Sequence, residues 1–152
     1  MHAPTACASG ARSYVQRAFL VGVAGRTRTL VGHSVVFYAT ERGEQPVRSY
    51  LDRVGRSGRV HELARIHRTI DLLVEFGSQL PQFGSVSRQL KGTDGLYELR
   101  CGSHRIAYGE DRLGRFVLLH AWKKETRKTT KTDLRTARRR HADWIEGDSG
   151  VS

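Results

Sequence analysis

Hydrophobic positions along the chain follow two different periods, and their order predicts an α+β fold. Residues 34–39 form a β-branched and aromatic run, which predicts a first strand. A short helix is expected over residues 46–54, because Pro46 suits the first helical position, where its missing N–H costs nothing. Over residues 59–76 apolar side chains recur every three or four positions, which predicts a longer amphipathic helix that Gly77 ends.

The second half of the chain predicts three consecutive strands after a Pro/Gly/Ser loop over residues 77–87. The first two, Leu96–Cys101 and His104–Glu110, are separated only by Gly102-Ser103, a connection typical of a type II′ hairpin. The third covers Phe116–Trp122. The order β-α-α-β-β-β predicts an antiparallel sheet with the helical pair packed on one face and the other face open.

A C-terminal helix is expected to begin after Thr130 or Thr132, either of which can cap it, and to run through Ile145. Its apolar stripe is thin. With 152 residues and 38% hydrophobic content, the chain predicts one small domain, which we place at residues 33–146, and a tail over 147–152.

Residues 1–32 are expected to be a disordered N-terminal extension outside the fold. The first 40 residues contain no Asp or Glu but several arginines. That composition is typical of an organellar transit peptide, or of an extension translated from an early start codon. The second interpretation is favoured because the remainder resembles a bacterial protein.

Charge is the second strong signal. The formal net charge is +11, and residues 112–141 hold 11 of the 26 Lys and Arg residues. Attraction to nucleic acid is the expected consequence, with an acidic protein partner as the alternative. No apolar run is long enough to span a bilayer, and the two cysteines lie in different settings, so we expect a reduced, cytoplasmic protein without a metal site or cofactor.

The three-strand segment carries the residues that RNA cleavage would require. Attack by a 2′-hydroxyl needs a base, cations that hold the pentavalent phosphate, and an acid for the leaving 5′-oxygen, but no metal. Arg100, Arg105 and Lys124 are the expected phosphate clamp. His120 is the best acid or base candidate because its ordinary pKa lies near neutrality. Further contacts to the RNA backbone are expected from Lys91, Lys123, Arg127, Lys128, Arg138 and Arg139.

The second proton-transfer role falls to Tyr108 or to Glu98, and simpler interpretations of these residues stay open. His120 also fits a hydrogen-bonded core histidine, and Tyr108 fits a half-buried strand aromatic. Arg105 also fits an ordinary cross-strand ion pair with Glu98.

The chain resembles the RelE/HigB toxin superfamily, in particular its phage-derived HigB-like branch. Four linked stretches within residues 34–145 carry the resemblance: VVFYATERGEQPVRSYLD, IHRTIDLLVEFG, QLKGTDGLYELRCGSHRIAYGE and FVLLHAWKKETRKTTKTDLRTARRR. The resemblance implies a RelE-like fold and a type II toxin that cleaves mRNA in the ribosomal A site, a metal-independent endonuclease. It also implies neutralisation by a helix-turn-helix antitoxin.

The resemblance also implies roles for particular residues. Arg100, Arg105 and Lys124 match basic positions of the family's strands. In two places this chain departs from the pattern: Glu98 stands where relatives carry lysine, and Thr130 falls near a catalytic tyrosine of some members. These departures leave room for His120, and they also allow a weak or inactive toxin. Two alternative functions stay open. One is a non-catalytic RNA- or ribosome-binding module, and the other is a co-repressor that acts only with its antitoxin.

Overall fold

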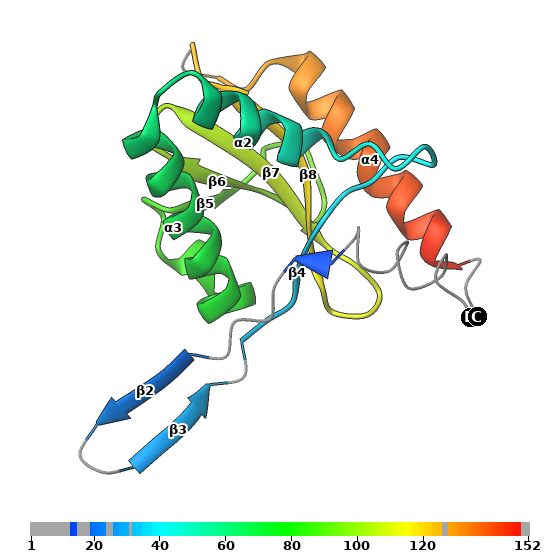
Figure 1. The fold of residues 1–152 in the computed structure, drawn as a ribbon. Coiled ribbons are helices and arrows are strands. Elements are labelled where there is room, and N and C mark those ends of the chain that lie inside the picture. Colours follow the sequence, from blue (N-terminus) through cyan, green and yellow to red (C-terminus); the bar gives the residue numbers. More distant parts are fainter. Residues whose placement is uncertain (1–12, 15–18, 24–25, 31, 126–127, 150–152) are drawn as a thin grey trace, which may run out of the picture.

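The computed structural model describes residues 13–14, 19–23, 26–30, 32–125 and 128–149 (Figure 1). The elements of the main fold are, in chain order, β4 (Val35–Phe37), α2 (Pro46–Arg56), α3 (Val60–Phe76), the 3-10 helix η1 (Gly77–Gln82), β5 (Ser87–Gln89), β6 (Leu96–Cys101), β7 (His104–Glu110), β8 (Phe116–Lys123) and α4 (Lys131–Ser149). The predicted α+β class is confirmed, as is the order of strand, two helices, three-strand segment and last helix. The segment predicted as a loop contributes η1 and the additional strand β5.

The sheet is mixed, whereas an antiparallel sheet was predicted. Its strands are ordered β1-β4-β8-β7-β6-β5, where β1 is the two-residue strand Ser13–Tyr14. Strand β4 runs parallel to β8, while the other neighbours are antiparallel. The difference has a topological cause. Two helices connect β4 to the rest of the sheet, so the chain can cross over and bring β4 alongside β8 in the same direction, which a tight hairpin would not allow.

One face of the sheet is covered by α2 and α3 (Figure 1). The predicted stripe of α3 is buried there, with Ile66, Ile70 and Leu73 each at most 1% exposed. These side chains pack against Leu99 and Ile106 of the central strands. Helix α3 ends at Phe76, as predicted, and Gly77 follows it with a positive φ of 53°.

The other face of the sheet is not open, contrary to the prediction, because α4 packs on it (Figure 1). Ala137 and Trp144 of α4 are buried against Val117 and Leu119 of β8. The indole of Trp144 also donates a hydrogen bond to Asp111 over 3.1 Å. A single large aromatic therefore anchors a helix whose aliphatic stripe alone is too thin to do so.

Two turns set the geometry of the segments that carry charge. Thr130, one of the two predicted caps, accepts a hydrogen bond from the main-chain N–H of Asp133 over 3.1 Å and donates one to its carboxylate over 2.5 Å. At the β6–β7 hairpin, Gly102 has a φ of 64°, as a Gly-initiated two-residue turn requires. Both predicted turns are thereby confirmed in position.

Part of the predicted N-terminal extension is described. Strand β1 (Ser13–Tyr14) pairs with β4, and β2 (Phe19–Val23) pairs with β3 (Arg26–Leu30). Residues 1–12, 15–18, 24–25 and 31 lie outside the described residues. At the other end, α4 continues to Ser149, into the segment predicted as a tail. The proposed domain limits stay a prediction. Of the helices that the structure describes, none has the length and hydrophobicity needed to cross a membrane.

Candidate functional site

The strand register collects the polar residues of the sheet into two rows. Cross-strand partners lie side by side on one face. The first row runs Arg88, Glu98, Ala107, His120 across β5, β6, β7 and β8, and the second runs Arg100, Arg105, Trp122 across β6, β7 and β8. Ala107 and Trp122 belong to the apolar cluster of the α4 side, so both rows lie on that face. We refer to these residues as the paired rows.

His120 reaches this face only because β8 contains a bulge. Ala107 pairs with His120, but the next residue, Tyr108, pairs with Leu118, so Leu119 is an extra residue in β8. Without the bulge, strict alternation would turn His120 and Trp122 toward α2 and α3, away from Arg105. The bulge thus brings the histidine and the cations together.

Arg105 has one nitrogen that is held by hydrogen bonds and one buried nitrogen that lacks a hydrogen-bond partner. Its Nη1 donates to the carbonyl oxygens of Gly102 (2.6 Å) and His104 (2.9 Å). The residue is only 6% exposed, and its buried Nε has no hydrogen-bond partner. Burial lowers the pKa of the guanidinium and the neighbouring Glu98 opposes that effect, but an arginine stays charged. A buried, charged N–H donor without an acceptor favours an anionic ligand there.

Glu98 is buried among cations and is 2% exposed. Its carboxylate accepts hydrogen bonds from Arg88 (3.3 Å) and from the hydroxyl of Thr129 (3.4 Å). The ion pair of Glu98 is thus with Arg88, not with Arg105 as the cross-strand interpretation held. The Nη1 of Arg100 donates to the carbonyl oxygen of Gly84 over 3.3 Å, and its side chain is half-buried. Sequence reasoning missed Arg88, because the three-residue strand β5 gives no periodic signal.

Both ring nitrogens of His120 have partners from α4. The Nε2 lies 2.8 Å from the carboxylate of Asp133, and the Nδ1 lies 3.2 Å from Nη1 of Arg140. A guanidinium only donates and a carboxylate only accepts, so Nδ1 is the acceptor and Nε2 carries the proton. Burial lowers the pKa of His120; Asp133 raises it and Arg140 lowers it further. The ring is therefore a neutral, oriented imidazole.

Asp133 and Arg140 were not predicted as partners of His120. The sequence assigned Asp133 only a favourable place near the start of a helix, and Arg140 only a place in a run of arginines. The hydroxyl of Thr130 also fixes the Asp133 carboxylate, so the helix cap and the histidine share one acidic group. A spacing of 13 residues between a histidine and an acid does not predict a contact from sequence, because the two residues lie on different elements and the sequence does not show how the segment between them runs.

The structure does not bring Tyr108 to the face of Arg105 and His120, and its proton-transfer role stays a prediction. It lies on the opposite face, 1% exposed, in the core cluster with Leu118. Its hydroxyl shares a 2.6 Å hydrogen bond with Ser87, and burial raises its pKa to about 12. The physical reason is the alternation of β7, which turns Tyr108 away from Arg105.

The remaining predicted cations are divided among several places. The main-chain N–H of Lys124 donates to Ser103 over 2.7 Å, which sets Lys124 beside the β6–β7 turn and the second row. Lys123 pairs in register with His104, on the α2–α3 face. Lys91 and Lys128 are exposed.

The predicted cations of α4 line a groove. Arg138 donates a hydrogen bond to the carbonyl of Gly92, which follows Lys91 in the sequence. The groove has a volume of about 550 Å³ and is lined by Lys131, Leu134, Arg135, Arg138 and Arg139. Arg127 lies outside the described residues.

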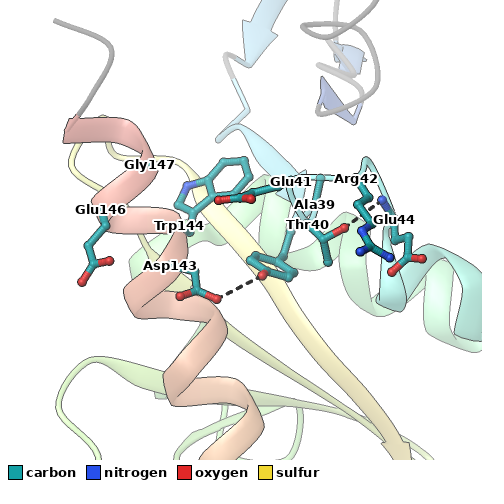
Figure 2. A pocket seen from close by; sticks show the side chains of 10 residues that line it. Ala39, Thr40, Glu41, Arg42, Glu44, Asp143, Trp144, Glu146 and Gly147 are labelled. Carbon is teal, nitrogen blue, oxygen red and sulfur yellow. Dashed lines mark hydrogen bonds between the residues drawn. The ribbon is translucent and has the colours of Figure 1, made fainter.

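One cleft of the described surface has the opposite charge. Figure 2 shows this cleft, of about 710 Å³, between the segment that follows β4 and the C-terminal part of α4. Its lining includes Glu41, Glu44, Asp143 and Glu146 against the single guanidinium of Arg42. Carboxylates repel a phosphate backbone, so RNA is expected to avoid this cleft. Within the described residues, no three His, Cys, Asp or Glu side chains are grouped as a metal site would require.

Comparison with known proteins identifies a family. No curated protein matches the chain. Residues 58–142 match the family described as Phage derived protein Gp49-like (DUF891). The matched range covers more than half of the chain and extends from just before α3 into α4, so it contains both paired rows. The chain therefore belongs to the phage-derived Gp49-like family.

Proposed function

We propose that this protein is a type II toxin that cleaves mRNA on the ribosome without a metal, and that a helix-turn-helix antitoxin neutralises it in the cytoplasm. The Gp49-like family is related to the HigB toxins, which are ribonucleases. The strongly positive net charge, +11, supports an RNA ligand. The family relationship supplies the reaction class, and the paired rows supply groups suited to it.

The observation that carries the proposal is the guanidinium of Arg105. Two backbone carbonyls fix its Nη1, while the buried Nε has no partner. A phosphodiester oxygen is the acceptor that this edge of an arginine binds best, because two parallel N–H donors match its geometry. Arg100 lies beside Arg105 in register, and Lys124 borders the same turn, so these residues form a clamp for a phosphate that gains charge in the transition state.

His120 is the proposed base, oriented by Asp133. In the reaction its Nδ1 takes the proton of the 2′-hydroxyl as the 2′-oxygen attacks phosphorus, and Asp133 stabilises the imidazolium that forms. The bond from phosphorus to the 5′-oxygen breaks, that oxygen takes a proton from solvent water, a 2′,3′-cyclic phosphate remains, and the imidazolium later returns its proton to solvent. Arg140 must leave Nδ1 first, since it occupies that nitrogen. The role that we assign to Glu98 is to hold Arg88 in the row.

A second candidate function follows from the same histidine. Both ring nitrogens of His120 have protein partners. If these hydrogen bonds persist when RNA binds, the imidazole transfers no proton, and the protein only binds RNA or the ribosome. The protein would then be a non-catalytic RNA- or ribosome-binding module. The two functions differ in whether replacing His120 abolishes activity while binding persists.

Growth assays in bacteria test the toxin proposal. Expression of the wild type is expected to arrest growth, and Arg105→Ala or Lys124→Ala is expected to relieve the arrest. Arg42→Ala, which removes one exposed guanidinium from the acidic cleft, is the charge-matched control and is expected to stay toxic. Arg105 is buried, so the half-exposed Arg100→Ala provides a variant with less risk to folding. Full toxicity of the folded Arg100, Arg105 and Lys124 variants would refute the clamp.

The partner can be tested independently. A small helix-turn-helix protein encoded beside this gene is expected to restore growth when it is expressed with the wild type. Its failure to bind the purified protein would exclude it as the antitoxin.

A further inference from the structure

Trp122 occupies a place in the paired rows that the phosphate clamp does not explain. It is the direct cross-strand partner of Arg105, on the same face. Its indole stacks on the imidazole of His120, with ring centroids 5.3 Å apart and planes inclined by 20°. The Trp122 side chain is only partly buried. Like Leu134 of α4, it packs against the apolar cluster on the α4 side of the sheet. The residue paired in register with Arg105 thus carries a flat aromatic ring, and the buried Nε of Arg105 itself has no hydrogen-bond partner.

We propose that Trp122 is a nucleobase-stacking subsite, which takes the base of a single-stranded ribonucleotide whose phosphate binds at Arg105. This inference rests on the proposed function. Directly paired residues on neighbouring strands have Cβ atoms about 5 Å apart and face the same side of the sheet. Arg105 and Trp122 are such a pair, so a nucleotide whose phosphate binds at Arg105 would have its base on the same face of the sheet as the indole.

The stack of Trp122 with His120 links the proposed subsite to the proposed general base. A base on the indole would continue a ring stack that ends on the imidazole proposed to accept the 2′-hydroxyl proton. Stacking on Trp122 would thus position the nucleotide relative to both the general base His120 and the phosphate clamp. Because every nucleobase has a π-face, such a subsite tolerates different sequences, and preferences would follow stacking strength.

Tryptophan fluorescence gives a direct readout. The chain has two tryptophans, and the other, Trp144, is buried and bonded to Asp111 away from the paired rows. In a Trp144→Phe background, a short RNA oligomer with one 2′-deoxy position to block cleavage is expected to quench Trp122. An abasic ribose-phosphate oligomer of equal length and charge is expected to bind without quenching. Quenching of equal size by both oligomers would overturn the subsite.

Affinities separate stacking from a purely structural role. Stacking of one base contributes roughly 1–3 kcal/mol, so Trp122→Leu is expected to weaken binding of the RNA oligomer about tenfold and to leave the abasic oligomer unchanged. Trp122→Phe is expected to recover most of the loss. An equal loss for both oligomers, or no loss for either, would contradict the proposal. Arg105→Ala is expected to weaken both oligomers alike, so a failed clamp is distinguishable from a failed subsite. Binding of neither oligomer by the wild type would refute both.

Discussion

Replacing Tyr50 by Phe should destabilise the protein through a hydrogen bond to a buried histidine on the face opposite the paired rows. His104 of β7 is 2% exposed, and its Nδ1 lies 2.7 Å from the hydroxyl of Tyr50 in α2. Its Nε2 lies 2.6 Å from the carboxylate of Glu62 in α3. Because a carboxylate only accepts, Nε2 carries the proton in the neutral ring and Nδ1 accepts from Tyr50. The imidazole of His104 therefore connects α2 and α3 to β7, at the residue that precedes Arg105.

The expected magnitude follows from what the substitution leaves behind. Phe keeps the ring, so apolar packing is unchanged, but the buried Nδ1 loses its donor. An unsatisfied buried polar group costs about 1–3 kcal/mol, so the free energy of unfolding should fall by that amount. For a chain of this size each kcal/mol lowers the melting temperature by roughly 2–4 °C.

Urea unfolding measures this change, and Tyr97→Phe is the matched control. Tyr97 is also half-buried and stacks on Tyr108, but no hydrogen bond of its hydroxyl occurs among the described residues. Its replacement should change stability by no more than about 0.5 kcal/mol. Equal effects of the two substitutions would refute the claim that the hydroxyl of Tyr50 satisfies the buried ring.

Two further predictions concern charge. The pKa of Glu62 is lowered, chiefly by the hydrogen bond from His104. The ionised carboxylate therefore contributes its full stabilisation above the ordinary carboxyl pKa of about 4.3, and this stabilisation is lost as the pH falls through the lower pKa of the folded state. The stability difference between wild type and Glu62→Gln should therefore shrink in acid, and a difference that stays constant to about pH 3 in urea titrations would contradict this. Asp133 raises the pKa of His120. Asp133→Asn should lower it in an NMR titration of the ring, whereas an unchanged value would exclude the contact in solution.

The sequence predicted most of the elements because their local signals agree with the final packing. Strands β6 and β7 have the predicted bounds, and α3 begins within one residue of its prediction. In each case the hydrophobic period matches the face that is buried. Glu98 and Arg100 share one face, as alternation within β6 implies, and Arg105 lies on that face because it pairs in register with Arg100.

What the sequence did not predict depends on contacts between distant segments. The parallel pairing of β4 with β8 follows from the path of two helices, and the bulge at Leu119 changes which face His120 occupies. Neither has a periodic signature. The cover provided by α4 depends on the single aromatic Trp144, and the partners of His120 come from that same helix. The face of His120 was therefore uncertain from sequence, and its hydrogen bonds could not be inferred.

Primer extension on mRNA in a reconstituted translation system tests the central claim most directly. Purified wild type is compared with the folded variants Arg100→Ala, Arg105→Ala, Lys124→Ala and His120→Asn. We expect cuts within codons that require ribosomes, occur without added metal beyond that of the translation buffer, and disappear in the clamp variants. Intact mRNA in the presence of wild type that still blocks translation would contradict the nuclease and favour the binding module.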